Sequence, residues 1–147
     1  MNREIRFRGK CQSGYDYSNG DGWVFGSLLQ NGNACGIVKK EDIDLSPAVD
    51  DGIQIISDFG FIPVITETVG QFTGLHDIDG RDIYEGDIVK NGLCGIWIIQ
   101  PLERGYFSLL GVCKKYKGSN YHISALNYNV EVIGNIHDNP ELLEVGK

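Results

Sequence analysis

Hydrophobic and polar positions alternate along much of this chain with a period of two. Near its beginning, Ile5 and Phe7 fall on one side of an extended segment, and the charged Arg6 and Arg8 fall on the other. Residues 23–30 are rich in the aromatic and β-branched side chains that pleated sheets favour. The pattern predicts strands with one face turned to a core and the other turned outward.

Turn sequences separate these strands at short intervals. Asn or Asp followed by Gly favours the positive φ angles of tight hairpins. Such pairs occur at Asn19-Gly20, Asp21-Gly22, Asp79-Gly80 and Asn91-Gly92. The strands expected between the turns are residues 5–8, 23–30, 34–39, 53–56, 62–66, 83–89 with an interruption at 85–87, 95–100, 106–112, 121–126 and 130–136.

Helix signals are few. Asn139 is suited to cap a helix, and Pro140 fits the first helical position. Ser46 and Pro47 stand in the same relation, but an exposed acidic loop explains residues 41–52 equally well. The sequence therefore predicts one or two short helical turns.

The predicted fold is mainly β. Twenty of the 147 residues are glycines, which favour turns and interrupt helices. We expect an N-terminal antiparallel β lobe, residues 1–66, packed on a small C-terminal SH3-like β-barrel, residues 67–147. The comparison with an SH3-like barrel rests on a strand at 86–89, a turn, and a second strand from Gly95, and it carries no functional conclusion.

The formal net charge of −7 limits the partners that the chain can bind. Nucleic-acid affinity rests mainly on Lys and Arg side chains that displace counterions from phosphates, so an acidic chain disfavours it overall. Two local basic clusters, at residues 3–10 and 114–117, run against this trend. Solvated surface faces account for clusters of this kind as well.

Cysteine usage and hydropathy indicate the compartment. Cys11, Cys35, Cys94 and Cys113 form no C-x-x-C pair and have no zinc-type spacing. The N-terminal sequence lacks the apolar core of a signal peptide, and no apolar run approaches the ~20 residues of a membrane span. We expect a cytoplasmic protein with reduced, mostly buried thiols rather than a disulfide framework.

No metal or catalytic motif is complete in the sequence. Asp77 and Asp79 in HDIDG match the start of a calcium loop, but Arg81 stands where the next ligand is needed and Ile88 where the final Glu is needed. A hairpin turn built on Asp79 and Gly80 explains these residues better. We therefore expect no metal and no cofactor.

Two sets of titratable side chains are open to a catalytic interpretation. They are the histidines His76, His122 and His137, and the carboxylates Glu67, Asp82, Glu85 and Asp87. A histidine could pair with a cysteine as a nucleophilic dyad, and paired carboxylates could do acid–base chemistry. Carboxylates beside turns more commonly accept hydrogen bonds from backbone N–H groups. We expect no enzyme, and an unrecognised hydrolase is the alternative.

One loop interleaves basic and aromatic residues. Its members are Lys114, Lys115, Tyr116, Lys117 and Tyr121 in the sequence KKYKGSNY. Bases or a peptide could pack on such tyrosines, and the lysines would attract phosphates. Core packing is the competing interpretation for the two tyrosines, and the sequence leaves that choice open.

Four segments of the chain resemble the YopX family of phage and prophage proteins. They are REIRFRG at 3–9, WVFGSL at 23–28, ETVGQFTGLHDIDGRDIYEGDIV at 67–89 and EVIGNIHDNPELL at 131–143. The central segment holds the structural signature Gly70, Gly74, Asp79, Gly80, Gly86 and Asp87. The resemblance implies a small cytoplasmic protein of a bacterial host cell with a mainly β fold. It assigns no activity and no catalytic residue.

Strand edges are the feature of this sequence best suited to binding. We expect a non-enzymatic phage accessory protein that binds protein partners or copies of itself, because unpaired strand edges invite pairing. The alternative is a nucleic-acid-binding module that uses the loop at 114–121. No membrane association is expected.

Overall fold

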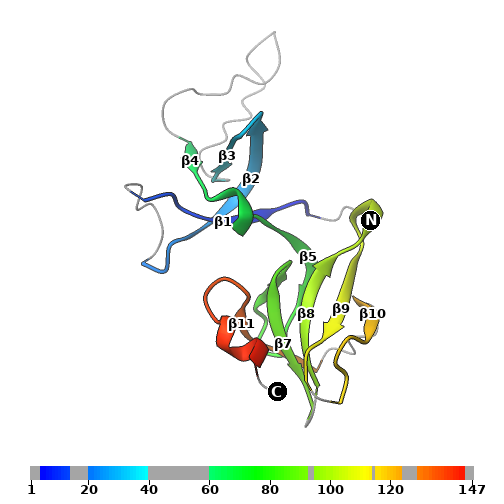
Figure 1. Ribbon diagram of the computed structural model, residues 1–147. Helices are drawn as coiled ribbons and strands as arrows, with labels where there is room; N and C mark the ends of the chain where they lie inside the picture. Colours follow the sequence, from blue (N-terminus) through cyan, green and yellow to red (C-terminus); the bar gives the residue numbers. More distant parts are fainter. Residues whose placement is uncertain are drawn as a thin grey trace. The chain divides into compact units, whose positions relative to one another are not determined.

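In the structure of the chain, a computed structural model, the regular elements of the described residues are mostly strands (Figure 1). It describes residues 4–13, 20–39, 60–92, 95–113, 115–123 and 129–144. These residues contain eleven strands and three short 3₁₀ helices, so the predicted mainly β fold is confirmed. The chain divides into two compact units: Ile5–Gln71, and Phe72–Lys147 together with Met1–Glu4.

The unit Ile5–Gln71 is built on an antiparallel sheet with the strand order β4-β3-β2-β1-β5. Beyond β1, Cys11 forms a bridge with Val64, and the Ile65 N–H donates to the Lys10 carbonyl at 2.8 Å. The residues directly after β1 therefore pair with the residues directly after β4, so the sheet curves round on itself there. Its elements are β1 Phe7–Lys10, β2 Trp23–Asn31, β3 Ala34–Val38, β4 Phe61–Pro63, the helix η2 Thr66–Thr68 and the first residues of β5 Gly70–His76.

The core of this unit lies on one face of the sheet. Phe7 of β1 and Val24 and Leu28 of β2 contribute to it, and they point to the same face because side chains alternate along a strand. Gly9 lets the Val64 side chain pack closely against β1, because a Cβ at residue 9 would press against that side chain. The buried members are Val24, Cys35, Ile37, Ile62 and Val64, and Phe7, Cys11, Leu28 and Val69 pack against them.

The second unit is built on a five-stranded antiparallel sheet with the order β10-β9-β8-β7-β11. The strand β6 pairs with β5 beside a turn at residues 77–81 and is the last strand of the other sheet, whose full order is β4-β3-β2-β1-β5-β6. The elements are β6 Asp82–Tyr84, β7 Asp87–Asn91, β8 Gly95–Pro101, β9 Phe107–Gly111, β10 Asn120–His122 and β11 Val130–Asn135, with the helices η3 Glu103–Gly105 and η5 Pro140–Glu144.

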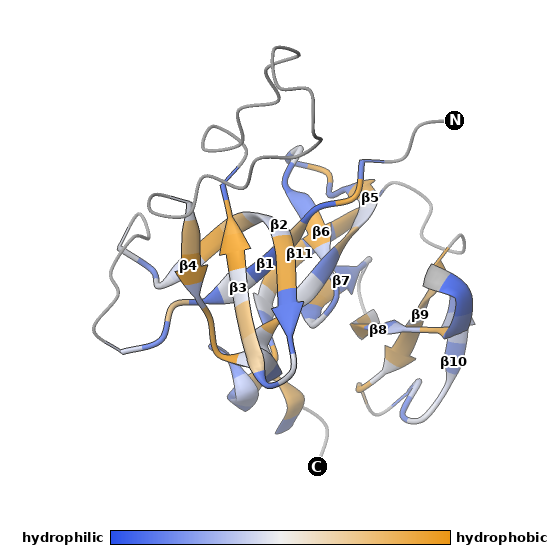
Figure 2. Ribbon diagram, turned by 90° about the horizontal axis from the view of Figure 1, so that it is seen from above, coloured by the Kyte–Doolittle hydropathy of each residue, from blue (hydrophilic) through white to orange (hydrophobic). Residues whose placement is uncertain are grey.

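Alternation along β8 shows how this sheet is buried. Trp97 and Ile99 are buried, whereas Ile96 and Ile98 between them are half-buried. The cross-strand partners of the buried pair, Gly111 and Leu109, lie on the same face. The core formed there comprises Ile83, Val89, Trp97, Ile99, Phe107, Leu109, Ile123 and Val130. Figure 2 shows the contrast between the apolar β9 and the hydrophilic β10 beside it.

The SH3-like barrel expected at residues 67–147 is not confirmed. Within the part of the chain that the structure describes, the five strands form an open sheet that ends at β10 on one side and at β11 on the other. The units meet in sequence inside β5, between Gln71 and Phe72, whereas the sequence indicates a boundary at 66/67. The helical turn considered at Ser46 and the strand expected at 53–56 lie outside the described residues.

The strand β5 is not among the strands that the sequence predicts. Gly70 and Gly74 suggest turns in the sequence, yet both lie within this seven-residue strand. Gly74 has a φ of +84°, and the pairing of β5 with β6 shifts register between Phe72 and His76. The glycine therefore permits a bulge inside a strand rather than a chain reversal.

Candidate functional site

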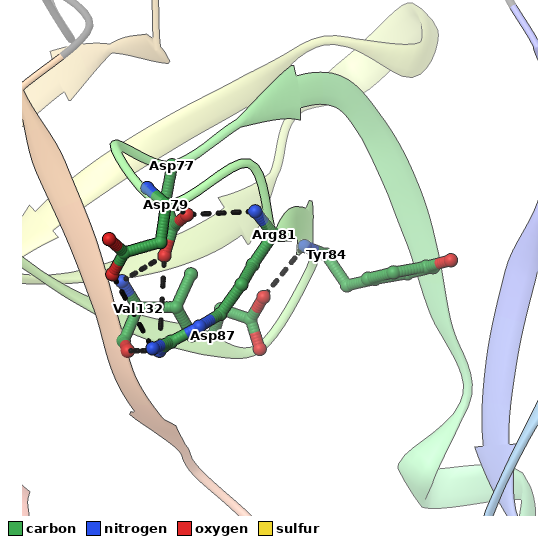
Figure 3. Close-up of polar contacts among 6 residues, drawn as sticks. All are labelled: Asp77, Asp79, Arg81, Tyr84, Asp87 and Val132. Carbon is green, nitrogen blue, oxygen red and sulfur yellow. Dashed lines mark hydrogen bonds and ion pairs between the residues drawn. The ribbon is translucent and has the colours of Figure 1, made fainter.

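The carboxylate of Asp77 organises the turn that follows β5 (Figure 3). Its Oδ1 accepts hydrogen bonds from the backbone N–H groups of Asp79, at 2.9 Å, and of Arg81, at 2.8 Å. Its Oδ2 accepts a third hydrogen bond, at 3.1 Å, from the N–H of Val132 in β11. The side chain is fully buried, so this one carboxylate both shapes the turn and attaches it to a distant strand.

Arg81 completes the attachment from the other end of the turn. Its Nη1 donates to the carbonyl of Val132 at 3.0 Å, and the Ile78 N–H donates to the carbonyl of Val130 at 2.9 Å. β11 pairs with β7 on its other side. The turn therefore forms hydrogen bonds with the backbone groups of Val130 and Val132 that point away from β7. These bonds occupy the β11 edge, so another strand cannot pair there.

The electrostatics of Asp77 follow from these contacts. Burial raises the pKa of its carboxyl, but the N–H groups of Arg81, Val132 and Asp79 and the charge of Arg81 together hold the pKa below the ordinary value. The Arg81 guanidinium lies 4.0 Å from Asp77 Oδ2 and 3.4 Å from the exposed carboxylate of Asp79. Asp77 is therefore a charged structural acceptor rather than a proton donor.

Asp87 has a similar role in the next turn. Its buried carboxylate accepts a hydrogen bond from the N–H of Tyr84 at 2.8 Å. Gly86, between them, has a φ of +86°, and its carbonyl accepts the N–H of Ile136 at 2.9 Å. The Glu85-Gly86-Asp87 interruption predicted in the strand is thus the turn between β6 and β7.

The signature residues have structural positions along this segment. Gly80, with a φ of +81°, closes the turn whose other corner is Asp79, and Gly70 pairs with Arg8 of β1. Sequence reasoning weighs Asp77 only as a calcium ligand and does not single out Arg81 for its reach to β11. The signal is present as an Asp followed after four residues by Arg across a D-G turn.

Among the candidate histidines and carboxylates, His76 of β5 and Asp82 of β6 lie together. His76 Nε2 lies 3.0 Å from Asp82 Oδ1, and its ring packs edge-on against Phe72. His122 packs instead against Tyr106. Across the residues that the structure describes, no three His, Cys, Asp or Glu side chains gather where they could hold a metal ion.

The opposite edge of the five-stranded sheet has a different character. All three residues of β10 are exposed, and β10 pairs with β9 along one side. The Tyr121 side chain packs edge-on against Trp97, with ring centroids 5.3 Å apart, while 47% of it stays exposed. Tyr106, which is 56% exposed, contacts the His122 ring. This edge, β10 with Tyr106, is called the β10 edge below.

The basic and aromatic loop divides between core and surface. The Tyr116 ring packs on Trp97, with centroids 5.0 Å apart, and is half-buried, whereas Lys117 is exposed. The Lys115 ammonium lies 5.0 Å from the centroid of the Tyr116 ring. Lys114 lies outside the described residues. Of the two tyrosines, Tyr116 therefore serves mainly the core, and Tyr121 presents the larger free surface.

The described cysteines are thiols. Cys35 is buried, Cys11 and Cys113 are half-buried, and none of the three forms a disulfide. Burial raises the pKa of the Cys35 thiol. Cys94 lies outside the residues that the structure describes.

Comparison with known families decides what this chain is related to. The family described as YopX protein matches residues 19–144, which is most of the chain. The chain belongs to the YopX family. Comparison with curated proteins gives no match. In the described parts of this YopX-family chain, no helix has the length and apolarity that crossing a bilayer requires.

Proposed function

We propose that this YopX-family chain is a phage- or prophage-encoded accessory protein of the bacterial cytoplasm that acts by binding and not by catalysis. Its partner is another protein or a second copy of the chain, and the contact is made by strand pairing at the β10 edge. Family membership supports the setting. The contrast between the two edges of the five-stranded sheet supports the mode of binding.

That contrast is the observation on which the proposal depends. At β11, Asp77, Ile78 and Arg81 take up the outward backbone groups of the strand. At β10, the three strand residues are exposed, and no further strand of the described residues lies beyond them. Natural sheets protect edges that are not used, because an open edge is a template for another strand. A sheet with one protected edge is suited to add a strand at the other.

The side chains around β10 suit a protein contact. Tyr121 and Tyr106 each expose about half of their surface, and tyrosine is enriched at the centres of protein interfaces. Trp97 packs against the Tyr121 ring and is itself packed against Tyr116. A ring that is already held in place loses little conformational entropy when a partner covers it.

A charge introduced at the edge tests the proposal. We expect the wild-type protein to self-associate in light scattering, or to retain a specific protein from phage-infected host lysate. Tyr121→Lys removes the ring and places a cation on the edge, and it should abolish either behaviour. Ile78→Lys is the matched control, because Ile78 is an exposed apolar residue beside the protected edge of the same sheet.

The behaviour of the two variants distinguishes binding at β10 from the alternatives. Loss in Tyr121→Lys with retention in Ile78→Lys supports binding at β10. Equal behaviour of the two variants, or a strictly monomeric wild-type protein that retains nothing, contradicts the proposal. Circular dichroism of both variants confirms that the fold is intact.

A second candidate function is nucleic-acid binding by the loop at 114–121. The stacking of the Lys115 ammonium on Tyr116, next to the exposed Lys117, favours it. The inward packing of Tyr116 against Trp97 leaves Tyr121 as the main aromatic surface for a base. Fluorescence anisotropy with single- and double-stranded probes tests this function, and no signal at about 50 mM salt would exclude it.

A further inference from the structure

The segment between β8 and β11, residues 102–129, has a charge opposite to that of the whole chain. It contains β9, β10 and the turns at both ends of β9. Counted over the full sequence, it holds four basic side chains and one acidic one, whereas the rest of the chain holds nine basic and nineteen acidic ones. The acidic residue is Glu103, and the basic residues are Arg104, Lys114, Lys115 and Lys117. The β10 edge therefore lies in a locally basic part of an acidic chain.

Arg104 lies near one end of the β10 edge. It belongs to the turn from β8 to β9, which closes where the Leu102 N–H donates to the Tyr106 carbonyl at 2.7 Å. The Tyr106 ring contacts the ring of His122, which is the last residue of β10. The turn that carries Arg104 is thereby joined to the end of β10.

Lys117 lies near the other end. It belongs to the turn from β9 to β10, which closes where the Gly111 N–H donates to the Ser119 carbonyl at 2.8 Å. Asn120, the first residue of β10, follows directly. The five residues of β9 separate the two turns, which corresponds to about 17 Å of extended strand. A segment laid along β10 would therefore have a cation near each of its ends.

Both of these cations are open to a partner. Arg104 and Lys117 are exposed, and neither forms an ion pair with another residue in the part of the chain that the structure describes. Lys115 is a different case, because its ammonium already lies 5.0 Å from the centroid of the Tyr116 ring. The charges available at the two ends of the edge are those of Arg104 and Lys117.

The backbone of Arg104 indicates that its side chain is used outside the fold. Its φ is +62° and its ψ is 28°, a left-handed conformation that glycine adopts at no steric cost. No other non-glycine residue among those described has a positive φ. Strained positions of this kind are concentrated at functional sites. Packing does not explain an arginine here, because the side chain is exposed.

We propose that the β10 edge binds an extended acidic segment of another protein, with Asp or Glu at both ends and apolar or aromatic side chains between them. This inference rests on the binding function proposed above and names its partner. The backbone of the segment pairs with β10, its terminal carboxylates pair with Arg104 and Lys117, and its middle packs on Tyr121 and Tyr106.

The same charges disfavour the other occupants of this edge. Two β10 strands paired about a two-fold axis would run antiparallel, so the Lys117 end of one copy would meet the Arg104 end of the other. Each end of the contact would then bring two cations together, and juxtaposed like charges oppose association. Nucleic acid would match the cations but has no strand backbone to pair with β10.

Fluorescence anisotropy with two labelled peptides tests the inference on the full chain. Both peptides share a central Thr-Val-Tyr-Val-Thr sequence, and one carries Asp pairs at its ends where the other carries Lys pairs. The measurement is made at about 150 mM salt, where the Debye length of about 8 Å screens repulsion from distant acidic residues. We expect the acidic peptide to bind and the lysine peptide not to bind.

Single substitutions locate the binding. Lys117→Gln and Arg104→Gly should each raise Kd for the acidic peptide about two- to fivefold, the effect of losing an exposed ion pair. Lys90→Gln is the matched control and should leave Kd unchanged, because it removes the same charge from β7, which β8 and β9 separate from β10. Arg104→Gly should not lower the melting temperature, since glycine suits this φ, whereas a structural role of Arg104 would lower it.

The inference and the proposed function can fail separately. Equal binding of the two peptides, or an equal loss in Lys90→Gln and Lys117→Gln, overturns the selection of acidic partners and leaves strand pairing at β10 in place. If neither peptide binds but the wild-type protein self-associates through Tyr121, the occupant is a second copy and the inference alone is overturned. If neither occurs, both are wrong. Tighter binding of labelled oligo(dT) than of the acidic peptide, lost in Lys117→Gln, would assign the cations to nucleic acid and overturn the inference.

Discussion

At the scale of single residues, Asp77 makes the contacts that organise the turn at residues 77–81 and join it to β11. Three backbone N–H groups converge on its buried carboxylate, and two of them belong to its own turn while the third belongs to β11. A buried charge is tolerated when hydrogen bonds replace its hydration, as they do here. The motif HDIDGR therefore supplies a hydrogen-bonded connection between its own turn and β11, which is more than fifty residues away in the sequence.

The substitution Asp77→Asn should destabilise the fold. The amide side chain keeps the size and one acceptor oxygen, but its NH₂ group faces a backbone N–H and the charge is lost. We expect a loss of about 1.5–3 kcal/mol, the range for hydrogen bonds to charged groups, as a lower midpoint of urea unfolding. Asp79→Asn is the control, because this exposed carboxylate should contribute no more than about 1 kcal/mol. Equal losses in the two variants would refute the role of Asp77.

Acid should remove the contribution of Asp77. Its pKa in the folded protein is below the ordinary value of about 3.9, so the stabilisation is complete above that pH and is lost as pH falls toward the folded pKa. The difference in unfolding free energy between wild type and Asp77→Asn should be constant near neutrality and shrink below about pH 4. Urea unfolding across this range measures it. A difference that grows on acidification would have the wrong sign.

At the scale of elements, the strands are largely predictable from alternation and turn pairs. The expected strands at 23–30, 95–100 and 130–136 correspond closely to β2, β8 and β11. β5 escapes prediction because Gly74 carries a positive φ inside a strand, and local sequence cannot distinguish a bulge from a turn.

The edge closure at β11 is beyond sequence reasoning for a different reason. Arg81 and Val132 are distant in the chain, and their hydrogen bond exists only because β11 returns beside β7. The turn itself is predictable from Asp79 and Gly80. What the turn contacts depends on strand order, which no local pattern specifies.

Gly111 should be indispensable where β9 meets the loop that precedes β10. A Cβ here would collide with the backbone carbonyl of Tyr116, which cannot move without displacing the Tyr116 ring from Trp97. We expect Gly111→Ala to cost about 1–3 kcal/mol, as overpacking usually does, and to shift the NMR signals of Tyr116 and Trp97. Gly92→Ala is the control, since it has a positive φ but open space around it. A milder effect of Gly111→Ala than of Gly92→Ala would contradict this account.

At the scale of the whole molecule, the chain consists of two units, each with its own core. In the second unit, the β10 edge is the surface that we propose for binding. In the unit Ile5–Gln71, alternation in the sequence places Arg6, Arg8 and Lys10 on one face of the first strand. The Trp23 ring beside Arg8 and Lys10 becomes apparent only from the register of β1 and β2.

Backbone hydrogen exchange followed by NMR tests the central claim, that one edge of the five-stranded sheet is closed and the other binds, most directly. In the free, monomeric state the Val132 amide, bonded to the buried carboxylate of Asp77, should exchange slowly, and the β10 amides that do not pair with β9 should exchange quickly. On association with a second copy or a protein partner, protection should appear at Asn120–His122 and remain unchanged at Val130–Asn135. Rapid exchange at Val132 in the free protein, or new protection that bypasses β10, would contradict the account.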